Sequence, residues 1–284
     1  MTPFELIEPR TLREAAALLG TDDAAVRAIA GGTALMLMMK SGVFQPTRLV
    51  SLRGVESGYA QIAVEPDGSL RVGALTTLSA LARSPAVRSA APVITRTLKT
   101  LSNVRVRNVA TLGGHLAHAD PHMDLPPVLM ALDATVTAVT PTASRTIAVA
   151  DLYVAYYETA LARNELIAEV VVPSQLGRRA AYMKVTTRSA DDWPTLGIAV
   201  SLSVDGGVVT DARIVASAAT ETPTRLQSAE SVLRGMAVTD NLLKRCGEAA
   251  AAEVQLVADA RGSAAYKSEL LRVYTTRAVR AAWV

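Results

Sequence analysis

The chain has 284 residues, of which half are hydrophobic, and its 29 basic and 26 acidic side chains leave a formal charge of +3. This length is sufficient for two domains that each bury a sizeable core. The small charge surplus and the 4% content of aromatic residues argue against a nucleic-acid-binding protein, which needs clustered cations and stacking surfaces.

The first 55 residues predict a small α/β unit. Thr11 followed by Glu14 forms a capping box, which opens a short helix that Gly20 ends. Strands are predicted over residues 26–30 and 48–52, with a second, apolar helix between them.

Gly31-Gly32-Thr33 joins the strand at residues 26–30 to the apolar helix. A strand, a Gly-Gly-Thr turn and a helix in this order can hold a phosphate on backbone amides. A tight turn before a buried helix is the alternative interpretation of so short a pattern. The apolar run over residues 28–39 is about half the length of a membrane span, and no secretory signal pattern opens the chain. We therefore expect a cytoplasmic protein without a membrane span.

Residues 56–175 alternate between strand and helix patterns, which predicts an α+β domain. Strands are predicted over residues 60–64, 70–74, 134–140, 146–149 and 166–172. Helical spacing covers residues 76–102, with interruptions at Pro85 and Pro92.

The segment over residues 104–133 concentrates functional side chains before an apolar helix. It contains Gly113, Gly114, His115, His118, Asp120, His122 and Asp124. Glycines near a helix start let the backbone approach an anion, because glycine lacks the Cβ that would block it. A phosphate-bearing cofactor is therefore the first interpretation of this segment.

The three histidines and two carboxylates of this segment also raise the question of a metal site, since both ligand types suit divalent metals. Their spacing matches no metal-binding motif, and Pro121 and the Gly pair indicate irregular backbone rather than one ligating face. We instead expect His118 and Asp120 to hold the loop by hydrogen bonds and His122 to be solvated.

Beyond a change of composition at residues 174–179, the sequence predicts a three-stranded antiparallel sheet backed by helices. The strands are predicted over residues 180–187, 195–204 and 208–217, and the helices over 226–234, 240–253 and 264–282. The only cysteine, Cys246, is expected to be a half-buried helix residue. One cysteine excludes an internal disulfide and a cysteine-ligated iron–sulfur cluster, which needs about four thiolates.

A charged run lies at the end of the first C-terminal strand. It comprises Lys184, Arg188, Asp191, Asp192 and Trp193. One interpretation is a solvated strand end; the other is that a cation and Tyr182 face a ligand in the cleft between two domains. The Rossmann, P-loop and nucleophile-elbow motifs are absent from the sequence.

Four ordered blocks, over residues 30–40, 107–134, 159–173 and 182–200, resemble the FAD-binding medium subunit of molybdenum hydroxylases. This is the flavoprotein of the carbon monoxide dehydrogenase and xanthine dehydrogenase family. The resemblance implies an α+β FAD-binding domain at residues 1–175, with subdomains at about 1–55 and 56–175. A C-terminal α+β domain at residues 176–284 would follow, with an extended FAD between the two domains.

The resemblance also implies which residues contact FAD. Two loops would surround its pyrophosphate and ribityl chain: Ala30, Gly31, Gly32, Thr33 and Ala34, and Thr111, Leu112, Gly113, Gly114 and His115. Asp124 would hydrogen-bond the cofactor, and Ile167 would lie beside its ring. Tyr182 and Lys184 would lie near the isoalloxazine, where positive charge favours a reduced, anionic flavin.

Three departures from the family pattern bear on the substrate. Carbon monoxide dehydrogenase subunits have His-Ser where this chain has Thr33-Ala34, and Asn or Asp is common at the position of His115. The cysteine-rich loop of the benzoyl-CoA reductase branch is also missing, since Cys246 stands alone. FAD binding is thus predicted without an assignment to carbon monoxide oxidation.

In this family, a large subunit hydroxylates substrate at a molybdenum cofactor, and a small subunit carries two [2Fe–2S] clusters. The FAD on this chain would take electrons from the clusters and pass them to NAD, oxygen, a quinone or another carrier. A dimer of heterotrimers is the assembly that the resemblance implies. Two alternatives are a stand-alone flavin oxidase or reductase, which needs its own acid or base near the ring, and a partner-binding module without flavin.

Overall fold

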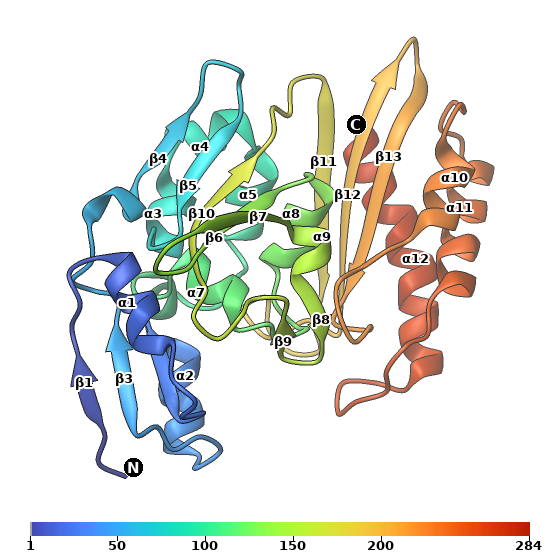
Figure 1. The fold of residues 1–284 in the computed structure, drawn as a ribbon. Helices are drawn as coiled ribbons and strands as arrows, with labels where there is room; N and C mark the ends of the chain where they lie inside the picture. The colour runs from blue at the N-terminus through green and yellow to red at the C-terminus, as the bar shows by residue number, and fades with distance from the viewer. Residues whose placement is uncertain (1) are drawn as a thin grey trace.

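Three main β-sheets follow one another along the described chain, and helices cover each of them (Figure 1); a two-stranded hairpin is the fourth sheet. The computed structural model describes residues 2–284. The first sheet is parallel, and the second and third are antiparallel. This is the α+β architecture that the sequence predicts.

The first sheet has the strand order β1-β3-β2. Its unit comprises β1 (Glu5–Ile7), α1 (Leu12–Leu19), β2 (Val26–Ile29), α2 (Thr33–Lys40) and β3 (Arg48–Ser51). The Thr11 hydroxyl accepts the Glu14 N–H at 3.0 Å, so the predicted cap of α1 is present. Strand β1 is not predicted from the sequence, because three residues are too few to form a periodic pattern.

The second sheet has the order β4-β5-β10-β6-β7. Its strands are β4 (Ile62–Val64), β5 (Leu70–Gly73), β6 (Thr135–Val139), β7 (Ser144–Ala148) and β10 (Leu166–Val172). The helices are η1 (Ser57–Ala60), α3 (Leu78–Arg83), α4 (Pro85–Ala90), α5 (Pro92–Thr97), α6 (Val104–Arg107), α7 (Leu112–Ala117), α8 (Leu125–Ala131) and α9 (Val149–Leu152). A small hairpin of β8 (Tyr153–Ala155) and β9 (Glu158–Thr159) follows α9. Pro85 and Pro92 each open a helix, as the predicted interruptions require.

The third sheet has the order β11-β12-β13-β14. It consists of β11 (Arg178–Val185), β12 (Leu196–Asp205), β13 (Val208–Ser217) and β14 (Thr224–Arg225), with helices α10 (Gln227–Leu233), α11 (Asp240–Glu253) and α12 (Ala264–Trp283). The three long strands are those predicted, and the two-residue β14 extends their edge. Among residues 2–284, no helix combines the length and hydropathy that crossing a bilayer requires.

Cys246 is fully buried, with its Sγ 3.5 Å from the Ala229 carbonyl. The expectation of a half-buried cysteine was therefore wrong. The reason lies in the packing, because α11 contacts both α10 and α12. Helix neighbours on two sides close its inner face, and burial raises the pKa of the Cys246 thiol to about 12.

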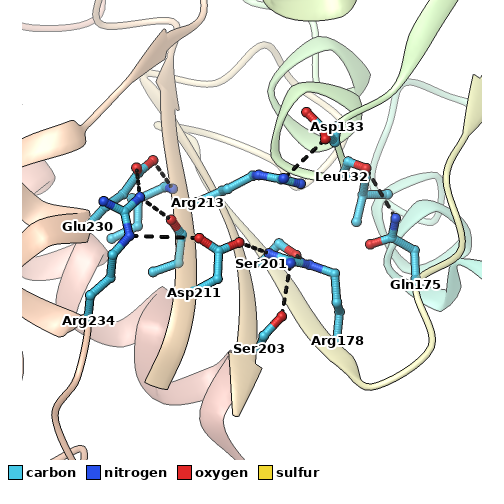
Figure 2. A network of polar contacts seen from close by, with 12 residues as sticks. Leu132, Asp133, Gln175, Arg178, Ser201, Ser203, Asp211, Arg213, Glu230 and Arg234 are labelled. Carbon is cyan, nitrogen blue, oxygen red and sulfur yellow. Dashed lines mark hydrogen bonds and ion pairs between the residues drawn. The ribbon is translucent and has the colours of Figure 1, made fainter. Parts of the chain in front are cut away.

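The third sheet packs against the second unit through β12 and β13, which contact α8. Figure 2 shows polar contacts at one side of this packing, where Arg213 on β13 pairs with Asp133 at 3.1 Å. Gln175 donates to the Leu132 carbonyl at 3.1 Å. The Arg213–Asp133 ion pair thus attaches the third sheet to the end of α8, and α8 comes directly after the histidines in the chain.

Candidate functional site

The two Gly-containing loops, residues 30–34 and 111–115, lie in contact and are called the Gly loops below. A Cβ on Gly31 would come within 2.1 Å of the Val109 carbonyl oxygen, so the first loop rests directly on the chain that enters the second. Across the same contact, a Cβ on Gly114 would be 3.8 Å from the Ala30 Cβ. The fold therefore brings together two segments that are far apart in sequence.

The four glycines of these loops have different roles. Gly31 and Gly113 make room for neighbouring chain: a Cβ on Gly113 would be 2.6 Å from the Ala74 Cβ. Gly32, the N-cap of α2, has φ +69°, a left-handed conformation that favours glycine. Gly114 is exposed. Of the four, Gly114 is the exposed one and leaves its backbone open to a ligand, which the pattern of glycines in the sequence does not reveal.

Helix α7 contains the Gly pair in its first turn. Its N-cap is Thr111, whose hydroxyl accepts the Gly114 N–H at 3.2 Å. Gly114 and Ala117 are exposed and lie three residues apart, so they share one helix face. This face of α7 is a strip of backbone and small side chains beside Ala30, which a ligand can approach closely.

His115 is buried in α7, and burial lowers the pKa of its imidazole to about 3, with a smaller effect from His118. The ring is therefore neutral at pH 7. Within residues 2–284, its Nε2 has no hydrogen-bond partner. A buried nitrogen without a partner is a group that a bound ligand can satisfy. Together with the open face of α7, this nitrogen fits a polar, phosphate-bearing cofactor such as FAD.

Asp124, Tyr182 and Lys184 form one buried cluster where α8 meets β11. The Tyr182 hydroxyl donates to Asp124 Oδ1 at 2.7 Å, and Lys184 Nζ lies 3.0 Å from Asp124 Oδ2. The same ammonium donates to the Thr100 carbonyl at 2.8 Å. Burial raises the pKa of Asp124 although Lys184 opposes this shift, and burial next to Asp124 raises that of Tyr182.

Gly197 makes the position of Tyr182 possible. It lies on β12 in register with Lys184, and a Cβ there would be 2.6 Å from the Tyr182 hydroxyl. No local sequence pattern singles out this glycine, because its contact crosses two strands. The Lys184 side chain is only 7% exposed, while Arg188 and Asp191 are exposed. The charged run is thus solvated only beyond Lys184.

Ile167 is buried at the irregular step between β10 and β6, within the core of the second unit. A paired ammonium at Lys184 presents little net charge to its surroundings, because the Asp124 carboxylate is only 3.0 Å away. The cluster is thus suited to fixing geometry where the second and third sheets meet. It holds no free acid or base for proton transfer.

A second polar cluster joins the loop between α7 and α8 to the C-terminal domain. His122 is buried, with Nδ1 3.0 Å from Asp120 Oδ1 and Nε2 3.3 Å from Asp259 Oδ2. The expectation of a solvated His122 was wrong. Asp259 lies between α11 and α12, far along the chain, so no local pattern announces this contact. The fully buried Lys267 completes the cluster, 2.9 Å from Asp259.

Asp120 holds its loop as expected: it accepts the His122 N–H and the Tyr157 hydroxyl, both at 2.8 Å. His118 does not show the expected hydrogen bonds in the described residues; its ring meets Tyr157 edge-on, with 5.4 Å between centroids. Within residues 2–284, no three His, Cys, Asp or Glu side chains converge as metal ligands.

We expect Asp259→Asn to lower the free energy of unfolding by about 1–3 kcal/mol at pH 7, because Lys267 loses its charged partner. Burial alone would raise the pKa of Asp259, but hydrogen bonds from Lys267, Arg261 and His122 hold it below its ordinary value. The native state therefore favours the carboxylate, and this stabilisation is lost as pH falls through and below the ordinary Asp range, about 4. Urea unfolding should show that the variant and the unchanged chain differ less in free energy of unfolding at pH 3.5 than at pH 7. Asp205→Asn, at an exposed strand end, is the control. If Asp259→Asn lowered the free energy of unfolding equally at both pH values, the Asp259 carboxylate would not be the stabilising group.

Comparison with known proteins matches two family models. Residues 2–175 match the FAD binding domain in molybdopterin dehydrogenase, and residues 180–282 match the CO dehydrogenase flavoprotein C-terminal domain. The carbon monoxide dehydrogenase medium chain of Hydrogenophaga pseudoflava is 32% identical over 287 residues, which covers 99% of this chain and 97% of the relative. The nicotine 6-hydroxylase medium subunit of Paenarthrobacter nicotinovorans is 31% identical over 271 residues, which covers 95% of this chain and 94% of the relative.

Solved structures agree with these matches. A carbon monoxide dehydrogenase chain from Hydrogenophaga pseudoflava superposes with a TM-score of 0.95 at 33% identity, over 100% of this chain and 99% of the other. A chain of quinoline 2-oxidoreductase from Pseudomonas putida 86 superposes with a TM-score of 0.93 at 28% identity, over 99% of this chain and 97% of the other. The chain belongs to the family of FAD-binding medium subunits of molybdopterin dehydrogenases.

Proposed function

We propose that the chain holds one FAD against the two Gly loops. The observation that carries the proposal is their contact, in which Gly31 rests on the backbone of Val109 while Gly114 stays exposed beside Ala30. Two turns that present open backbone at one place suit a pyrophosphate, because amide N–H groups stabilise its negative charge. The FAD would extend from there between an FAD-binding domain at residues 1–175 and a C-terminal domain at residues 176–284.

Within this proposal, the residues of the chain bind and orient the cofactor. Gly32 and Gly114 permit close backbone approach, and neutral His115 supplies a hydrogen-bonding nitrogen. Thr111 holds the first turn of α7 in place through its cap. The remaining loop residues would shape the two turns around the cofactor, Gly31 and Gly113 by making room for neighbouring chain. They are Ala30, Gly31, Thr33, Ala34, Leu112 and Gly113.

The ring end of FAD would lie toward the cluster at β11. Asp124, held by Tyr182 and Lys184, offers a fixed carboxyl group there, and Ile167 contributes apolar surface. Bound FAD supplies the redox chemistry, since it accepts single electrons and delivers pairs. A stand-alone flavin enzyme would need a free acid or base at the ring, whereas Asp124 is already engaged by two partners.

The electrons would come from a small partner subunit that carries [2Fe–2S] clusters, because the single Cys246 of this chain cannot ligate one. A large subunit with a molybdenum cofactor would oxidise the substrate. The relatives named above as medium chains or subunits support such a division of labour. We infer a dimer of heterotrimers in the cytoplasm, with NAD, oxygen, a quinone or another carrier as the final acceptor.

The test is an ultraviolet–visible spectrum of the purified chain after incubation with FAD and desalting, with the released nucleotide identified by chromatography. We expect about one FAD per chain. The same measurement on the chain co-expressed with its molybdenum and iron–sulfur partners detects a site that the partners complete. Absence of FAD from both preparations would contradict the proposal.

A further inference from the structure

Residues 68–119 contain no acidic side chain. In the same stretch there are seven cations: Arg71, Arg83, Arg88, Arg96, Lys99, Arg105 and Arg107. Because the whole chain carries only +3, positive charge is concentrated in this stretch and the rest of the chain is net acidic. Arg71 is neutralised by Glu65 and Glu169. Across residues 2–284, no ion pair involves the other six cations.

Four of these cations surround one recess of about 500 Å³. It is lined by Arg88 on α4, Arg96 on α5, Lys99 just beyond α5 and Arg107 on α6, together with Ala82, Pro92, Thr95 and Leu98. Helices α3, α4 and α5 lie close together beside β4 and β5 (Figure 1). The recess is thus built from elements other than the Gly loops.

Two of the guanidinium groups are held in position by backbone carbonyls. Arg96 Nη2 donates to the Ala180 carbonyl at 2.7 Å, and Arg107 Nη1 donates to the carbonyls of Leu101 and Ser102. A guanidinium has five N–H donors in a planar fork, so each group keeps donors for a ligand. Bracing of this kind reduces the conformational entropy that a ligand must overcome on binding.

Four cations line the recess, and within residues 2–284 no ion pair involves any of them, so the arrangement favours a bound anion. We propose that this recess binds a small polyanion that carries phosphate groups, of the size of pyrophosphate or a nucleoside diphosphate. Planar guanidinium forks match phosphate oxygens two at a time. The volume lies in the range of small-molecule sites, about 300–1,000 Å³. A recess, in contrast to a flat basic face, favours a small ligand over an acidic protein surface.

The test is isothermal titration calorimetry of the full chain saturated with FAD, so that the Gly loops are filled. Pyrophosphate and ADP are the probes, and adenosine is the uncharged comparison. We expect saturable binding of one probe molecule per chain, weakening as ionic strength rises, and no binding of adenosine. If the chain retains no FAD, titration of the chain with and without Gly114→Leu separates the recess from the Gly loops.

Arg88→Glu with Lys99→Glu should weaken binding by at least about tenfold, since two of the four cations change sign. Arg83→Glu with Arg105→Glu is the matched control, because these exposed residues lie in the same stretch but do not line the recess. It makes the same change in net charge and should alter affinity by less than about twofold. Within residues 2–284, the side chains of these four residues make no hydrogen bond, and the Asn103 side chain accepts from Arg105 only its backbone N–H, so both variants should fold. Equal weakening by the two pairs, absence of saturable binding, or binding of a poly-glutamate peptide in preference to pyrophosphate would each overturn the proposal.

Discussion

Gly114→Leu is expected to abolish FAD retention while the chain stays folded. Gly114 is exposed on α7, and its nearest neighbours for an added Cβ are Thr111 Oγ1 at 3.0 Å and the Ala30 Cβ at 3.8 Å. A leucine side chain there would cover the open face of α7, yet it suits a helix. We expect FAD affinity to fall by at least about 100-fold, or about 2.7 kcal/mol. The thermal midpoint should shift by only a few degrees, as is typical of a surface change.

Gly31→Ala is expected to differ from Gly114→Leu, because it should affect stability as well as FAD retention. Its added Cβ would meet the Val109 carbonyl oxygen at 2.1 Å, and the backbone cannot yield as a flexible side chain would. This variant should therefore lose stability together with FAD. Gly58→Ala serves as the control for both, because a Cβ at Gly58 has open space around it. Desalted spectra and thermal unfolding of the three variants would test this, and full FAD retention by Gly114→Leu would contradict the proposed cofactor site.

Asp124→Ala should destabilise the chain by about 3–5 kcal/mol, because it leaves the ammonium of Lys184 buried without its carboxylate. Lys184 is 7% exposed, and only the Thr100 carbonyl would remain as its partner. The Tyr182 hydroxyl would lose its acceptor as well. Urea unfolding monitored by circular dichroism measures the effect.

A double-mutant cycle separates the ion pair from general damage to the core. Adding Lys184→Met to Asp124→Ala removes the unpaired charge, so the double variant should recover about half or more of the loss. Asp191→Ala, at an exposed position of the following loop, should change stability by less than about 0.5 kcal/mol. Additive losses in the cycle would show that Asp124 and Lys184 do not act as a pair.

The secondary structure followed closely from the sequence, because its signals are local. Thr11 and Glu14 are three residues apart and mark the start of α1. Gly206 and Gly207 both have positive φ and form the two-residue turn between β12 and β13. The missed strand β1 and the short β14 depend on neighbours that lie elsewhere in the chain, not on a pattern of their own.

Local sequence signals predicted only part of the candidate site. The sequence identified the two Gly loops and pointed separately to Asp124, Tyr182 and Lys184. The convergence of Asp124 with Tyr182 and Lys184 depends on the packing of the third sheet against α8, which no local pattern encodes. His122 shows the same limit, because its burial depends on Asp259 from another domain.

The sequence by itself determined the helices, the long strands and the family resemblance. Each of these depends on residue type and on spacing over a few positions, or on order along the chain. Tertiary structure decided which glycines serve packing and which leave open backbone, as Gly31 and Gly114 illustrate. It also decided that cations from α4, α5 and α6 share one recess. These properties depend on distances between segments remote in sequence, and packing of the whole chain sets those distances.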